Sequence, residues 1–228
     1  VYVMGERGAR REPATAADRA RMKALATEAM QAGALGFATS QLMIHRTGRG
    51  ENIPTYAAGV DELRAIAEGL AEAGGGLLQF VPDIPTTGSY AAVLAPLFGV
   101  ARATGLPLTS PPGLGHSGPR LYPDALALVE QFNAAGGRIS AQLLPRPVGL
   151  LCGLELSVNP FVLCPGYQPL ARLALADRVR EMRRPEVRAR LLADTPAEGH
   201  PLTALGRNWE WMFPVAEEPD YEPPRERS

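Results

Sequence analysis

The sequence predicts an α/β fold with a parallel sheet, and three observations support this prediction. Short apolar segments of the kind that form buried strands alternate with longer segments whose apolar residues recur at helical spacing. The helical segments end at glycines, and the next strand segment begins almost at once. The connections from a strand to the next helix are long, whereas the return connections are short. Serial units of this kind form parallel sheets, whose functional surface lies where the strands end.

Five strands are expected, and they cover residues 1–5, 34–40, 77–81, 106–110 and 138–144. Pro107 argues mildly against a central place for the fourth strand, because proline cannot donate a hydrogen bond to a neighbouring strand. Helices are expected over residues 16–32, 60–73, 90–103 and 123–135, and beyond the last strand over 167–184 and 185–193. Thr15, with Asp18 three residues later, is expected to cap the first helix.

Two parallel architectures fit such units: a doubly wound open sheet and part of an eight-stranded barrel. A nucleotide-binding open sheet is disfavoured because no P-loop follows any strand. We therefore predict an α/β fold in the form of a partial (βα)8 TIM-type barrel. Five strands cannot close a barrel and the chain starts without methionine, so the barrel is expected to be incomplete at the N-terminus and at the C-terminus.

The expected barrel domain covers residues 1–194. Residues 195–228 are expected to form a Pro-rich, acidic tail segment, because residues 217–228 include too few apolar side chains to bury a core. An open partial barrel exposes apolar interior and unpaired strand edges, which favours self-association.

Composition excludes several functional classes. The formal net charge of −1 gives no electrostatic footprint for nucleic-acid binding. No apolar run reaches the roughly 18 residues that a membrane helix needs, so no membrane partner is expected and the simplest location is the cytoplasm. Two cysteines, Cys152 and Cys164, are too few for a disulfide-stapled scaffold and are interpreted as small buried hydrophobes.

Several polar residues follow the predicted strands, where barrel enzymes place functional side chains. Asp83 comes directly after the third strand and is a weak candidate for a catalytic group, with turn capping as the alternative. His45 lies on the long loop 41–55, and His116 lies on a later loop at the same face; both also fit solvated loop histidines. His200 lies outside the strand–helix pattern and is interpreted as structural.

Arg146 stands between two prolines at the end of the fifth strand. Each proline restricts the backbone, so the guanidinium is presented from a stiffened position suited to a bidentate contact with a carboxylate. A salt bridge between elements is the alternative. The sequence contains no His-x-His and no strand that ends in histidine, so no residue is assigned as a metal ligand.

Several segments resemble the N-acyl-D-amino-acid deacylase (D-aminoacylase-like) group of the amidohydrolase superfamily. The segments are 1–8, 28–40, 142–151, 159–161, 177–179 and 184–188. The resemblance spans most of residues 1–194. It implies a (βα)8 barrel beside a small β-sandwich, and zinc-assisted hydrolysis of a C–N amide bond in N-acyl amino acids or related amides.

The resemblance also implies where the machinery of that group would lie. Its metal-binding His-x-His is on the first barrel strand and its catalytic Asp is on the last, both outside this chain. Zinc is therefore expected in a full-length parent, and this chain alone is expected to be inactive. The predicted strands 77–81 and 106–110 lack the group's metal-binding histidines. This departure leaves open a second function, a non-catalytic degenerate barrel or assembly module.

By position, residues 39–46 and 142–146 match substrate-pocket regions of the group. The resemblance therefore assigns His45, Arg46, Gln142 and Arg146 to substrate binding, with Arg146 as the anchor for a carboxylate.

Overall fold

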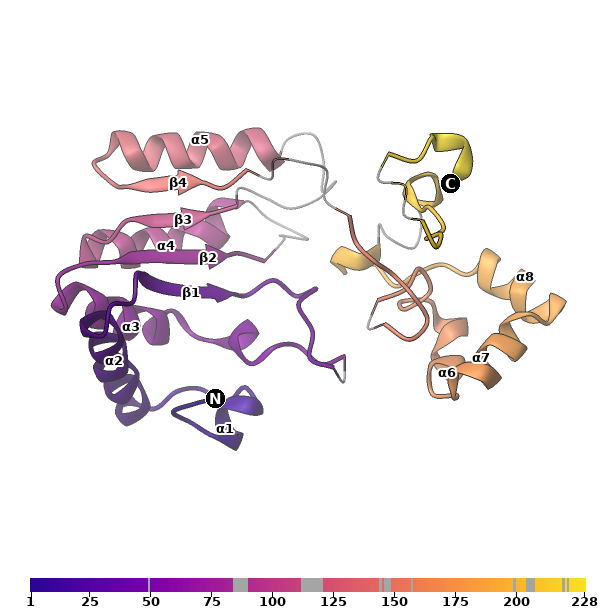
Figure 1. Cartoon of the computed structure of the whole chain (residues 1–228), viewed down its shortest axis with the longest axis horizontal. Coiled ribbons are helices and arrows are strands. Elements are labelled where there is room, and N and C mark those ends of the chain that lie inside the picture. Colours follow the sequence, from indigo (N-terminus) through magenta and orange to yellow (C-terminus); the bar gives the residue numbers. More distant parts are fainter. Residues whose placement is uncertain are drawn as a thin grey trace. The chain divides into compact units, whose positions relative to one another are not determined.

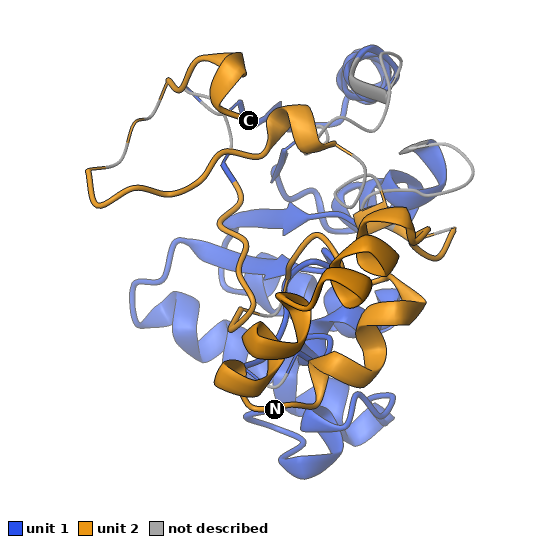
Figure 2. Cartoon of the chain, turned by 90° about the vertical axis from the view of Figure 1, so that its right-hand side faces the viewer, with its two compact units in different colours: residues 1–149 blue, residues 150–228 orange. Residues whose placement is uncertain are grey.

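The computed structural model describes residues 1–48, 50–83, 90–111, 121–143, 145, 149–156, 158–198, 200–203, 208–218, 220 and 222–228 (Figure 1). The chain divides into two compact units, Val1–Gly149 and Leu150–Ser228, which are coloured separately in Figure 2. Each unit has its own hydrophobic core.

The first unit contains one parallel sheet whose strands lie in chain order (Figure 1). The strands are β1 (Gly36–Ser40), β2 (Leu77–Val81), β3 (Leu108–Ser110) and β4 (Ile139–Ala141). All three neighbouring pairs are parallel. The α/β fold with a parallel sheet is therefore confirmed. A doubly wound sheet reverses its strand order at a switch point, whereas this order runs in one direction, as in a partial TIM-type barrel.

Helices that alternate with the strands form one layer against the sheet. They are α2 (Ala16–Gln31), α3 (Val60–Glu72), α4 (Tyr90–Thr104) and α5 (Leu121–Ala134). Each of these helices packs on the next one along the chain. The core between this layer and the sheet joins strand residues such as Leu78, Phe80 and Leu108 to helix residues such as Leu70 and Val100.

The first of these helices begins as its sequence predicts. The Thr15 hydroxyl accepts a hydrogen bond from the Asp18 backbone N–H at 3.2 Å, and the Asp18 carboxylate accepts one from the Thr15 N–H at 2.8 Å. This capping box satisfies two backbone donors that would otherwise lack partners. Arg7 donates to the same carboxylate at 3.0 Å. The hydrogen bond from Arg7 and those from Thr15 lower the pKa of Asp18 to about 2.

The prediction of a strand over residues 1–5 is wrong. The chain turns there, the Gly5 N–H donates to the Val1 carbonyl at 2.7 Å, and the short helix α1 (Glu6–Ala9) follows. Gly5 makes this turn possible because its φ of 57° lies in the left-handed region that glycine enters without strain. A short apolar run has no periodicity that could separate this turn from a strand.

Pro107 does not keep its strand at an edge, since β3 lies between β2 and β4. The proline precedes β3, and its carbonyl accepts a hydrogen bond from the Leu78 N–H at 3.0 Å. The pairing between β2 and this position therefore uses the carbonyl group of Pro107 and does not need the N–H that proline lacks.

The second unit is built from short helices and 3-10 turns. They are η2 (Pro165–Tyr167), α6 (Gln168–Ala171), α7 (Leu175–Met182), α8 (Pro185–Ala193), η3 (Pro201–Thr203), η5 (Trp209–Trp211) and η6 (Arg225–Arg227). The helix expected over 167–184 is divided, because the backbone turns at Leu173 and Ala174 between α6 and α7. The core of the unit joins Cys164, Tyr167 and Leu170 to Val187 and Leu191 on α8.

Among the helices of the described residues, none combines the length and the apolar character that a bilayer crossing requires.

Candidate functional site

The face of the sheet opposite the helix layer is polar. Side chains alternate along a strand, so the burial of Leu78 and Phe80 in the helix-facing core places Gln79 on the other face. The strand register aligns Gln79 with Ala38 on β1 and Thr109 on β3, and Thr109 with Ser140 on β4. We call the face that carries these four residues the inner face. Its small and polar side chains differ from the aliphatic and aromatic ones that meet the helices.

Gln142 extends the inner face beyond the end of β4. Its backbone N–H donates to the Ser110 carbonyl at 3.0 Å, which continues the pairing of β4 with β3. Its side-chain Oε1 lies 3.5 Å from Nε2 of Gln79. Two carboxamides from different strands therefore meet at the carboxyl end of the sheet, and the Gln142 side chain is exposed there. Carboxamides of this kind can donate to and accept from an amide or a carboxylate of a ligand.

His45 pairs with a serine at the end of β1. Its Nδ1 lies 2.9 Å from the Ser40 hydroxyl, which also accepts a hydrogen bond from the Leu42 N–H at 3.1 Å. The Ser40 carbonyl in turn accepts from the Thr55 hydroxyl at 2.6 Å, which attaches the loop 41–58 to the strand. The imidazole is exposed, so a ligand can reach it while it keeps its contact with Ser40.

Asp83 joins the end of β2 to the same loop. Its Oδ1 accepts a hydrogen bond from the Met43 N–H at 3.0 Å, and the carboxylate also accepts one from the Tyr56 hydroxyl. Burial raises the pKa of Tyr56, the charge of Asp83 and this hydrogen bond raise it further, and the charge of Arg46 acts in the opposite direction. Asp83 thus holds the loop that carries His45 through contacts with residues far from it in the sequence.

Arg46 lies on the same loop and is half-buried. Its backbone forms an isolated antiparallel bridge with Asn52, which closes the loop on itself. The structure therefore gathers His45, Arg46 and Asp83 around the ends of β1 and β2. Gln142 extends from the end of β4.

Three further candidates were named from the sequence. Arg146 and His116 lie outside the described residues. His200 belongs to the second unit, where its Nδ1 accepts a hydrogen bond from the Leu202 N–H at 3.1 Å.

The part of the chain that the structure describes contains no group of three or more His, Cys, Asp or Glu side chains able to hold a metal ion. No residue is therefore assigned as a metal ligand, and no chemical step is derived through a metal. Neither cysteine forms a disulfide within the part of the chain that the structure describes. Cys164 lies in the core of the second unit, and burial raises the pKa of the half-buried Cys152, which favours its neutral thiol.

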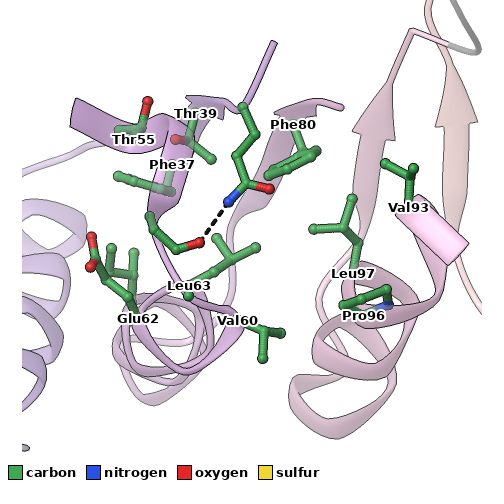
Figure 3. Close-up of a pocket in the computed structure, with 14 residues that line it drawn as sticks. Phe37, Thr39, Thr55, Val60, Glu62, Leu63, Phe80, Val93, Pro96 and Leu97 are labelled. Carbon is green, nitrogen blue, oxygen red and sulfur yellow. Dashed lines mark hydrogen bonds between the residues drawn. The ribbon is translucent and has the colours of Figure 1, made fainter. Parts of the chain in front are cut away.

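A cavity of about 180 Å³ lies on the helix side of the first unit (Figure 3). Phe37 and Phe80 from β1 and β2, and Leu63 and Leu97 from α3 and α4, supply its apolar walls. Burial raises the pKa of the Glu62 carboxyl at its margin. The cavity is thus separated from the inner face by the sheet itself.

Three residues that contact these candidates were not predicted from the sequence: Ser40, Tyr56 and Gln79. The alternation in the segment 77–81 could have identified Gln79, since a single polar residue there lies between two apolar ones. The partnerships of Ser40 and Tyr56 depend on how the loop folds back, and no local pattern in the sequence signals them.

Comparison with known proteins identifies the family of the chain. No curated protein and no solved structure matches the chain. The family model described as "Amidohydrolase family" matches residues 1–210, which is most of the chain. The matched residues include every strand of the sheet and the loop that carries His45. The amidohydrolase part of the predicted resemblance is thereby confirmed, and the chain belongs to the amidohydrolase family.

Proposed function

We propose that the chain is part of a hydrolase that acts on the C–N amide bond of N-acyl amino acids, or of related amides, within the D-aminoacylase-like group. Membership of the amidohydrolase family indicates a hydrolase. The finer substrate class is supported by the sequence segments that resemble the group. The observation that carries the proposal is the set of polar side chains at the carboxyl ends of the parallel strands, where barrel enzymes bind their substrates.

The described residues suit the parts of such a substrate. The Gln79 and Gln142 carboxamides offer donors and acceptors for an amide group. The exposed imidazole of His45 can form a hydrogen bond with a polar group of the substrate. Arg46 is a cation on the same loop that can pair with the carboxylate of an amino acid, and Arg146 is proposed for the same role from its sequence position.

A metal of the kind used by this family would polarise the scissile carbonyl and activate water. We propose zinc as that metal. The described residues of this chain do not form a site for it, so we assign none of them to it. Binding of substrate, which the inner face could perform by itself, is therefore the property to test first.

Titration with N-acyl-D-amino acids and their L-enantiomers, followed by NMR or calorimetry, tests the substrate class. We expect saturable binding that His45→Ala and Gln142→Ala each weaken about tenfold, because one hydrogen bond to a polar or charged ligand contributes about 1–3 kcal/mol. Gln131→Ala provides the matched control, since Gln131 is an exposed glutamine on α5. The proposal fails if none of these ligands binds, or if both site variants bind as the unchanged protein does.

A second candidate function is a non-catalytic barrel or assembly module. It is favoured by the ends of β2 and β3, which continue into Pro82–Asp83 and Pro111 without a histidine. Zinc titration followed by thermal unfolding, together with an assay of amide hydrolysis, separates the two functions. In a protein that carries the complete barrel, stoichiometric zinc with zinc-dependent turnover identifies an enzyme, whereas a folded protein with neither property identifies a module; this chain alone is expected to lack turnover under both functions.

A further inference from the structure

The second unit contains an open groove of about 320 Å³ between α7 and α8. Val179 and Met182 on α7, and Leu191 and Leu192 on α8, form most of its apolar surface together with Phe161. The groove continues the core of the unit, because Leu191 belongs to that core and Met182 and Phe161 pack against it. Leu192 is 58% exposed, so apolar surface of the groove remains open to solvent.

One arginine from each side completes the groove: Arg183 and Arg188. On each side of the groove the arginine and the two apolar residues share one helical face. Residues 179, 182 and 183, and residues 188, 191 and 192, each follow the spacing i, i+3, i+4. The groove therefore combines an apolar surface with two cations at its edge.

These two arginines differ from their neighbours in how they are paired. Arg180 forms an ion pair with Asp177 at 2.6 Å, and Arg184 forms ion pairs with Glu181 at 3.0 Å and Glu186 at 2.5 Å. The Arg178 guanidinium donates hydrogen bonds to backbone carbonyls of the same unit. Within the described residues, Arg183 and Arg188 form no ion pair.

The excess of positive charge is set by the sequence of the helix pair. Residues 175–193 contain six arginines and three acidic residues, and the paired arginines described above use all three of these acids. Arg183 and Arg188 thus keep their charge available beside an apolar surface. An anion with an apolar body is the ligand that satisfies both features.

We propose that the groove between α7 and α8 binds a medium-chain acyl carboxylate, with its hydrocarbon chain against Val179, Met182 and Leu192 and its carboxylate held by Arg183 and Arg188. The forked donors of arginine match the two oxygens of a carboxylate. The volume of about 320 Å³ is at the lower end of the range typical of small-molecule sites. An amphipathic helix would need anchor positions over more turns than the eight residues of α7 supply.

Calorimetric titration with decanoate, below the concentration at which it forms micelles, tests the proposal on the whole chain. We expect one saturable site, and we expect decylammonium and decanol to bind at least about tenfold more weakly, because they carry the same chain without the carboxylate. Decylammonium binding as tightly as decanoate would show that the arginines play no part and would overturn the proposal.

Variants locate the site. The double substitution Arg183→Gln and Arg188→Gln is expected to weaken decanoate binding about tenfold or more. The matched control, Arg172→Gln with Arg190→Gln, removes two exposed charges from the same unit that do not line the groove, and it should bind decanoate normally. Equal losses in both double variants would show a general charge effect and contradict the proposal.

Leu192→Asp supplies an independent test that leaves both arginines in place. Leu192 is exposed, so the variant should keep its circular dichroism spectrum. The new carboxylate in the groove repels the carboxylate of the ligand. We expect decanoate binding to be lost. Unchanged binding in a folded Leu192→Asp protein would place the ligand elsewhere and overturn the proposal. The proposal would also fail if an acidic peptide displaced bound decanoate at concentrations at which decanoate does not displace the bound peptide.

Discussion

Asp18 has a carboxyl whose charge state is set by its neighbours. Arg7 and Thr15 hold the pKa of its carboxyl at about 2, below its ordinary value of 3.8. Because the folded-state pKa is depressed, the ionised carboxylate contributes stability that is fully present above about pH 3.8 and is lost as the pH falls through about 2. Asp18→Asn should therefore be less stable than the unchanged protein near neutral pH, and the difference should vanish below about pH 2. Urea unfolding at several pH values measures it; a difference that does not depend on pH would contradict this account.

Thr15 contributes to the same cap without a charge. Thr15→Ala removes the hydroxyl that accepts from the Asp18 N–H, and we expect a loss of about 1 kcal/mol in the free energy of unfolding. Thr15→Ser keeps an acceptor at the same place and should recover most of this loss. If the serine variant is as unstable as the alanine variant, packing of the methyl group and not the cap accounts for the effect.

Tyr56 reports on the contact between the loop 41–58 and the end of β2. Burial and then the carboxylate of Asp83 raise its phenol pKa above the ordinary 10.0. Asp83→Asn removes the negative charge, so the pKa of Tyr56 should fall, and NMR of the ring carbon bonded to the hydroxyl can follow it. Asp61→Asn, at an exposed position in the first turn of α3, is the matched control. An unchanged pKa in Asp83→Asn would show that burial alone raises it.

The predicted site illustrates what one sequence can and cannot indicate at the scale of residues. The sequence predicts that Asp83 and His45 lie near the carboxyl ends of strands, and because parallel strands bring these ends to one edge, this prediction needs only the strand positions. Their partners Tyr56 and Ser40 depend on the path of a loop whose residues are far apart from Asp83 in sequence. Local patterns carry no information about that path.

At the scale of elements, α2 and α3 pack so closely that a glycine is required between them. A Cβ added at Gly69 on α3 would lie 2.3 Å from the Lys23 carbonyl oxygen of α2. Alanine has a better helix propensity than glycine by about 1 kcal/mol, but overpacking against a backbone atom costs about 1–3 kcal/mol. We expect Gly69→Ala to destabilise the protein in urea unfolding.

Gly99 on α4 is the matched control for this prediction. A Cβ there would meet nothing within 4 Å, so only the helix propensity changes. Gly99→Ala should raise the free energy of unfolding by up to about 1 kcal/mol. If both alanine variants are stabilised to the same extent, α2 and α3 are less closely packed than the Gly69 geometry requires.

The elements whose bounds the sequence predicts correctly carry strong local signals. The strand over 77–81 and the helix over 185–193 have the predicted bounds, because alternation and a proline at the first helical position define them. The turn at residues 1–5 was missed because a short apolar run has no periodicity that separates a turn from a strand. The division between α6 and α7 was missed because it involves side-chain contacts that helical periodicity does not show: Arg178 on α7 donates to the carbonyl of Leu170 in α6 and to that of Leu173 between the two helices.

At the scale of the whole molecule, the described sheet has β1 and β4 as its outer strands, each with one neighbour. Leu35, just before β1, is 89% exposed and Leu143, just after β4, is 64% exposed. Unpaired backbone groups beside apolar side chains favour pairing with another chain. We therefore expect self-association, seen as a sedimentation coefficient that rises with protein concentration.

Lysine at these two positions should suppress the association, since a charge at a strand edge opposes pairing with a second edge. Leu35→Lys and Leu143→Lys are therefore expected to sediment as a single species over a wide range of concentration. Leu156→Lys makes the same change at a 46% exposed leucine of the second unit and should associate as the unchanged chain does. A protein that is monomeric at every concentration would contradict the prediction. Association that Leu156→Lys alone removes would assign the contact to the second unit, where the sheet edges have no part.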